Sequence, residues 1–139
     1  IGLILVYLGG SIGFNSWLIK GYMDTISPSL DEAAKVDGAT DFQIFRRIIA
    51  PLSRPILVVI FVITFIGIYS DFILAAIFLK DKNLWTVAVG INTVFVDDFN
   101  ADWGVIAASS VIAATPIAVL FIFFQKQITG GLTAGSVKG

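Results

Sequence analysis

Asp71 is the one acidic or basic residue inside the three longest apolar stretches of the sequence, and the polar residues Tyr69 and Ser70 precede it. An acid near the middle of a membrane costs about 2.5 to 3.5 kcal/mol on insertion scales, so it is expected to avoid lipid. A carboxylate there suits either hydrogen bonding to polar groups along a path through the membrane or a packing contact with another helix. Proton coupling is disfavoured, because these stretches hold no second acid, base or His to complete a relay.

Other residues that carry catalysis are missing or misplaced. The 139 residues contain no Cys and no His, which excludes disulfides, Cys or His metal sites, and a triad with an imidazole base. Gly130 and Gly135 have phosphate-loop separation, but Ser136 and Val137 follow where such a loop has Lys and Ser or Thr. The formal net charge of -1 offers no basic field for nucleic acid. We therefore predict no catalytic residue, no metal, no cofactor in this chain and no nucleic-acid partner.

The composition is that of a membrane protein. Hydrophobic residues make up 57% and charged residues 14%, against about 25% charged in soluble domains. Three apolar blocks, at about 1–19, 56–79 and 105–124, are each long enough to cross a bilayer core of roughly 30 Å as a helix. They lack the alternation of barrel strands. We predict an all-α fold, a polytopic membrane helix bundle with three transmembrane helices, and expect the sequence to be part of a longer protein because Ile1 lies inside an apolar run.

Basic residues in the connecting segments predict the orientation. Segment 20–55 holds five Lys and Arg residues and the tail 125–139 holds Lys126 and Lys138, whereas segment 80–104 holds Lys80 and Lys82 against four acids. Lys and Arg favour the cytoplasmic side, and three spans place the first segment and the tail on one side. We expect a cytoplasmic segment 20–55, an external loop 80–104 and a cytoplasmic tail.

The segment after the first span contains residues that typically start and end a short helix. Ser29, followed three residues later by Glu32, is typical of a capping box that opens a helix. Gly38 stands where a left-handed residue closes one. A helix of about two turns is predicted between these signals.

A second helix is predicted immediately afterwards. Thr40 and Gln43 repeat the capping pattern, and apolar residues follow at helical spacing. Pro51 and Pro55 are expected to bend the chain into the second span. From the residues alone, the two helices could be an amphipathic element lying on the membrane surface.

The identities in this segment resemble the EAA loop of binding-protein-dependent ABC importer permeases. The matching residues are Glu32, Ala33, Ala34, Asp37, Gly38, Ala39, Phe45, Ile48, Pro51 and Leu52. Residues 84–90 and the terminal 131–139 resemble the carbohydrate-uptake branch, and particularly its maltose-type permeases. The likeness covers nearly the whole chain. It implies the C-terminal half of one importer transmembrane domain, because members of the family carry further spans.

The resemblance also implies a role and a set of partners. Residues 29–52 would dock on a separate subunit that binds ATP and Mg and forms a dimer. A second, related permease in the inner membrane lipid would complete the path for a sugar, which the maltose-type resemblance specifies as maltose or a maltodextrin. The external loop would meet a sugar-binding protein. The tail either is a disordered end or contacts the ATPase through residues such as Thr133, Ala134, Gly135 and Ser136.

A different class of function stays open. The chain could be an ATP-independent ion-coupled carrier, or a membrane scaffold, that uses Asp71. Carrier activity would persist without an ATPase and vanish in Asp71→Asn. Importer activity would require the ATPase and respond to changes at Glu32 or Gly38.

Overall fold

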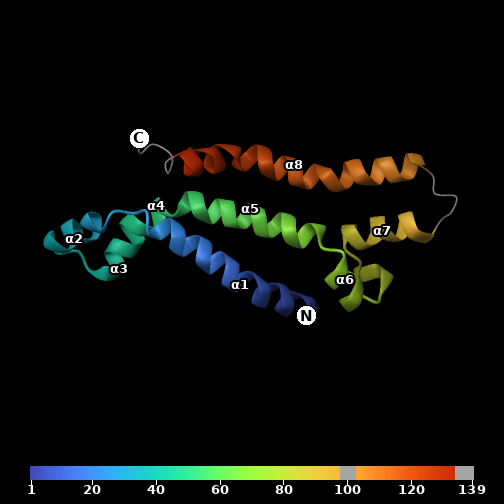
Figure 1. The fold of residues 1–139 in the computed structure, drawn as a ribbon, viewed down its shortest axis with the longest axis horizontal. Helices are drawn as coiled ribbons and strands as arrows, with labels where there is room; N and C mark the ends of the chain where they lie inside the picture. Colours follow the sequence, from blue (N-terminus) through green and yellow to red (C-terminus); the bar gives the residue numbers. More distant parts are fainter. Residues whose placement is uncertain (98–102, 134–139) are drawn as a thin grey trace. The chain divides into compact units, whose positions relative to one another are not determined.

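Every regular element in the part of the chain that the computed structural model describes, residues 1–97 and 103–133, is helical (Figure 1). A π-helical turn covers Phe45–Ile49 and a 3-10 turn covers Lys82–Leu84. The predicted all-α class is therefore confirmed over these residues. The α-helices are α1 (Gly2–Met23), α2 (Pro28–Val36), α3 (Asp41–Ile44), α4 (Ala50–Leu52), α5 (Arg54–Ser70), α6 (Ile73–Phe78), α7 (Val87–Asp97) and α8 (Trp103–Thr133).

Two of these helices, α1 and α8, are long and apolar enough to cross a membrane. The 17 residues of α5 qualify only together with the segment Asp41–Leu52, from which α5 is bent by 60°. The described residues thus contain two candidate spans, or three if the bent pair is one span. The bend falls between Pro51 and Pro55, as the sequence predicts.

The second apolar block differs from the continuous helix expected over 56–79. Helix α5 ends at Ser70 and α6 begins at Ile73. The Asp71 amide donates to the carbonyl of Ile68 at 3.3 Å, and the Asp71 carboxylate accepts the amide of Leu74 at 3.2 Å. An acid that bonds a backbone amide three residues ahead competes with continuation of the helix, so Asp71 starts a new helix here.

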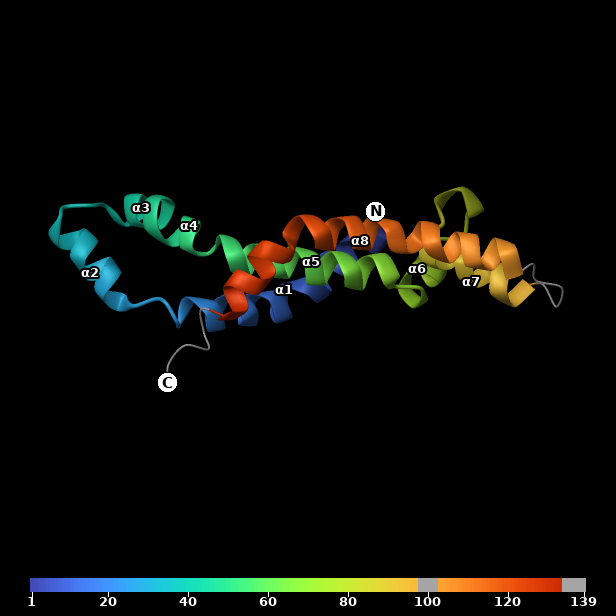
Figure 2. The ribbon, with the colours of Figure 1, turned by 90° about the horizontal axis from the view of Figure 1, so that it is seen from above.

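The expected external loop and tail also contain regular structure. Within 80–104, the chain forms the 3-10 turn and then α7. Between α6 and α7 the chain reverses its direction (Figure 2). Helix α8 continues beyond Phe124 to Thr133, so the first part of the expected tail is helical. Of the proposed ATPase-contacting residues, Thr133 ends α8, whereas Ala134, Gly135 and Ser136 lie outside the described residues.

The chain divides into two compact units. Unit 1 comprises Ile1–Ser11 and Val62–Phe123, and unit 2 comprises Ile12–Phe61 and Phe124–Gly139. Few of the side chains that the structure describes are buried: Val62, Ala75, Val89 and Ile106 in unit 1, and Ala34, Ile44 and Ser53 in unit 2. Large apolar residues such as Trp17, which is 70% exposed, lie on the surface. This distribution is expected of helices whose apolar faces contact lipid or other subunits.

Candidate functional site

Residues 29–52, which the resemblance assigns to docking on the ATPase, are here called the coupling segment. Helix α2 of this segment begins earlier than its capping signal predicts. Its first residue is Pro28, and Ser27 takes the extended N-cap position without a side-chain capping bond. The hydroxyls of Ser27 and Ser29 bond each other at 2.8 Å instead. The predicted box between Ser29 and Glu32 is therefore wrong, because Pro28, with its fixed φ, occupies the favoured first position of the helix.

The end of α2 follows the prediction at Gly38, whose φ is +80°. The Gly38 amide donates to the carbonyl of Lys35, and the Ala39 amide donates to that of Ala34, both at 3.0 Å. These two bonds define a Schellman motif, which needs a left-handed residue at its turn. The corner between α2 and α3 is thus set by backbone hydrogen bonds that depend on a glycine.

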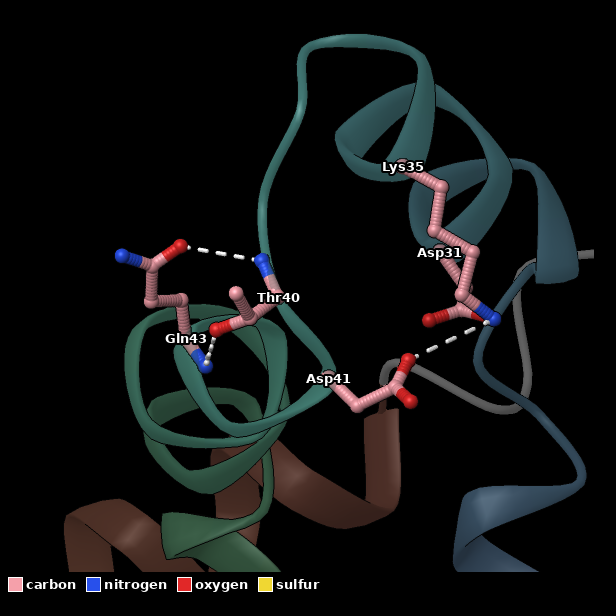
Figure 3. Close-up of polar contacts among 5 residues, drawn as sticks. All are labelled: Asp31, Lys35, Thr40, Asp41 and Gln43. Atoms are coloured by element: carbon pink, nitrogen blue, oxygen red, sulfur yellow. Dashed lines mark hydrogen bonds and ion pairs between the residues drawn. The ribbon is translucent and has the colours of Figure 1, made fainter.

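Helix α3 opens on the predicted capping box. The Gln43 amide donates to the Thr40 hydroxyl at 3.4 Å, and the Thr40 amide donates to the Gln43 side-chain oxygen at 2.9 Å (Figure 3). Two amides that the helix leaves without intrahelical partners are thereby satisfied. The second helix of the segment therefore starts at a well-defined residue, two positions after Gly38.

Lys35 links the two helices across this corner. Its ammonium contacts Asp31 of α2 at 2.8 Å and Asp41 of α3 at 3.8 Å (Figure 3). The hydrogen bond with Asp31, followed by the negative charge of Asp31, raises the pKa of Lys35 above its usual value; Asp41 and Glu32 add smaller contributions. The bridge is solvent-exposed, so it orients the helices more than it stabilises them.

The raised pKa of Lys35 predicts the pH range in which this bridge acts. A lysine whose pKa is higher in the folded chain adds stability below its unfolded pKa of about 10.4, and the contribution disappears as pH rises through the folded pKa. We expect Lys35→Gln to lower the melting temperature slightly at pH 8 and to have no effect at pH 12. A thermal melt of the purified protein at both pH values measures this, and equal differences at the two would contradict it.

The surface of the segment combines charge with exposed apolar side chains. Glu32, Ala33 and Asp37 are exposed, whereas Ala34 packs inward at 8% exposure and Ala39 is half-buried. Of the remaining predicted contacts, Phe45 and Pro51 are exposed and Ile48 is half-buried. The structure adds two residues that the sequence motif did not single out, Val36 at 88% exposure and Phe42 at 69%.

Exposed apolar side chains in a charged segment between spans indicate a protein contact. Val36 belongs to the α2 helix that presents Glu32 and Ala33, and Phe42 and Phe45 follow the Gly38 corner. Their alternation with acidic residues distinguishes this surface from the uniformly apolar spans. Val36 and Phe42 are identified by their exposure in the folded chain and not by their spacing in the sequence.

The segment is tied to the end of α1. The Tyr22 hydroxyl donates to the carbonyl of Leu52 at 2.9 Å. The buried Ser53 hydroxyl donates to the carbonyl of Ile49 at 2.7 Å and lies 3.7 Å from the sulfur of Met23. These contacts join the last turn of α1 to the junction of α4 and α5, so a displacement of the coupling segment reaches two membrane helices.

The three residues proposed for a translocation path have separate surroundings in unit 1. The Tyr69 hydroxyl donates to the carbonyl of Ala113 in α8 at 3.1 Å. Tyr69 and Ser70 both line a cavity of about 210 Å³. Asp71, which is not among the lining residues, caps the start of α6 and faces the buried Tyr7 hydroxyl, which lacks a hydrogen bond of standard geometry in the described chain. Tyr69 and Asp71 thus both make packing contacts.

Known proteins resemble the chain over almost all of its length. The family described as binding-protein-dependent transport system inner membrane component matches residues 1–133. The maltose/maltodextrin transport system permease protein MalG of Vibrio vulnificus (strain YJ016) is 48% identical over 138 residues, which are 99% of this chain and 46% of the relative. MalG of Escherichia coli (strain K12) is 46% identical over the same shares. The chain spans about half the length of these curated relatives.

Proposed function

Because the chain belongs to the family of binding-protein-dependent transport system inner membrane components, we propose that it forms part of the permease of an ATP-driven importer. Family membership makes it an inner-membrane component, in agreement with the apolar helices α1 and α8. In this proposal the chain lines part of the translocation path and transmits the motion of the ATPase to the membrane helices. A dimer of partner subunits hydrolyses the ATP.

The observation that carries the proposal is the corner between α2 and α3. Its Schellman motif, its capping box and the Lys35 bridge hold two short helices in one arrangement that exposes Glu32, Ala33 and Val36. Such a rigid projection suits docking in a cleft of another subunit, because little conformational entropy is lost on binding. Its attachment to α1 through Tyr22 supports transmission of the docked subunit's motion to the spans.

The cargo and the remaining partners follow from the relatives. Relatives at 46 to 48% identity are named as maltose/maltodextrin permeases, which supports maltose or a maltodextrin as the substrate. By the same likeness we assign the chain a second, related permease and an extracytoplasmic sugar-binding protein. Within the external loop 80–104, residues 97–100 are the proposed contact for the binding protein. The coupling residues 29–52 are the proposed contact for the ATPase.

The experiment that tests the proposal measures maltose uptake by the full-length protein, reconstituted with the candidate ATPase, the partner permease and the sugar-binding protein. Uptake should require ATP and the ATPase subunit. Asp71→Asn should retain uptake within about twofold, because an amide oxygen accepts the Leu74 amide as a carboxylate does. Uptake without the ATPase, abolished by Asp71→Asn, would instead identify an ion-coupled carrier. The absence both of uptake and of a complex with the ATPase would instead favour an ATP-independent scaffold.

A further inference from the structure

A cavity of about 290 Å³ lies in unit 1 among α6, the 3-10 turn and α7. This volume is near the lower limit of small-molecule sites, which begin at about 300 Å³. Its walls combine apolar side chains with an ammonium, an amide, a hydroxyl and an indole. The residues used in the argument are Leu79, Lys80, Trp85, Val89, Asn92 and Thr93.

Trp85 is held in one orientation at this cavity. Its indole N–H donates to the carbonyl of Leu79 at 3.1 Å, and the ammonium of Lys82 lies 5.6 Å from the centre of its ring. Tryptophan gathers at membrane–water interfaces, where its ring sits at the level of lipid headgroups. The half-buried Trp85 therefore indicates that the cavity lies near the headgroup region.

Lys80 lines the cavity, Lys82 lies over the ring of Trp85, and together with Asp81 these side chains carry a net charge of +1. The ion pairs among the described residues all involve Lys20 or Lys35, so neither Lys80 nor Lys82 is paired with a carboxylate of the described part of the chain. Asp81 stands between these lysines, but its carboxylate already accepts the backbone amide and the side-chain amide of Asn83, at 2.9 and 3.0 Å. The lysines and the Asn92 amide offer hydrogen-bond donors to an anionic group.

The surroundings of the cavity are apolar. Ile73 and Ile77 of α6 are 68% and 57% exposed, and Leu84 of the 3-10 turn is 63% exposed. A free anion gains nothing from such a surface, whereas an amphiphile buries its acyl chains against it. Apolar surface beside ammonium groups is complementary to a phospholipid.

We propose that this cavity binds the headgroup of an anionic phospholipid of the membrane. The phosphate contacts Lys80 and Asn92, Trp85 flanks the headgroup, and the acyl chains lie along the exposed residues of α6. This assignment does not depend on the transported substrate or on the ATPase. It adds a lipid-binding site to the family role. This site lies in a part of the chain that is distant in sequence from the coupling helices.

Tryptophan quenching by brominated lipid tests the proposal. In the protein with Trp17→Phe and Trp103→Phe, Trp85 is the only tryptophan in the 139 residues. The corresponding substitutions are made at any tryptophan in the rest of the protein. Vesicles of phosphatidylcholine receive a small fraction of brominated phosphatidylglycerol or of brominated phosphatidylcholine. Quenching of Trp85 should report an approximately fivefold enrichment of phosphatidylglycerol, the factor expected for one lysine at a charged headgroup.

Three single substitutions complete the test. Lys80→Gln should remove most of the enrichment and Lys80→Arg should keep it, and both changes are at an exposed residue. Lys20→Gln removes the same charge in α1 and should leave Trp85 quenching unchanged. Equal quenching by the two lipids, or enrichment that persists in Lys80→Gln, would overturn the proposal. Relief of quenching by added maltose would also overturn it and would identify the cavity as a substrate site.

Discussion

Replacing Gly38 with valine is expected to lower recovery of the complex with the ATPase subunit at least tenfold. Gly38 has a φ of +80°, a conformation that costs an L residue about 1 to 2 kcal/mol and a β-branched residue more. A Cβ at this position meets no atom within 4 Å, so the penalty comes from the backbone and not from a clash. Relief of the strain breaks the amide bonds of Gly38 and Ala39 and changes the angle between α2 and α3. Co-purification and maltose-stimulated ATP hydrolysis measure the loss.

Gly38→Asn is the matched control. Asparagine is the residue other than glycine that most often takes this left-handed position at the end of a helix, and it adds more atoms than valine to the same open space. It should retain complex recovery within about threefold. Both variants should insert in the membrane like the wild type, because no apolar block is altered. If the two variants lose recovery equally, the corner's backbone conformation is not what the ATPase recognises.

The second large effect is expected at Val36, an apolar side chain that is 88% exposed in the free chain. Val36→Asp places a carboxylate where the proposed docking removes water, at a cost of about 2 kcal/mol or more, which corresponds to a roughly 30-fold loss of affinity for the ATPase. The stability of the chain itself should change little, because Val36 makes almost no buried contact. Binding of the purified ATPase to the reconstituted protein, titrated by surface plasmon resonance, measures the effect.

Val36→Thr separates the role of charge from that of shape. Threonine has nearly the shape of valine and puts a neutral hydroxyl in place of one methyl group, so it should weaken binding less than the charged aspartate does. Leu84→Asp provides a second comparison of affinity for the ATPase. Leu84 is also exposed, at 63%, but it lies in the 3-10 turn of unit 1, outside the proposed docking surface. An unchanged affinity in Val36→Asp would exclude Val36 from the docking surface and confine that surface to the residues of the EAA motif.

Local sequence signals predicted much of the coupling segment. Gly38, Thr40 and Gln43 act on backbone groups within five residues of themselves, and the structure contains the bonds that their spacing predicts. The same reasoning misplaced the first box, because two adjacent signals competed and Pro28 outweighed Ser29. It also treated residues 56–79 as one helix, since apolar composition does not reveal that Asp71 bonds the amide of Leu74.

The sequence alone determined the helical class, the membrane environment and the family resemblance, because these depend on composition, on local backbone bonding and on the order of residues. Only the tertiary structure decided which separated residues meet: Lys35 with Asp41, Tyr22 with Leu52, and Tyr69 with Ala113. It also decided that Val36 is exposed while Ala34, two residues away, is buried. Such contacts depend on the angles between helices and on the faces that pack, and these follow from bends and long-range packing that the order of residues does not display.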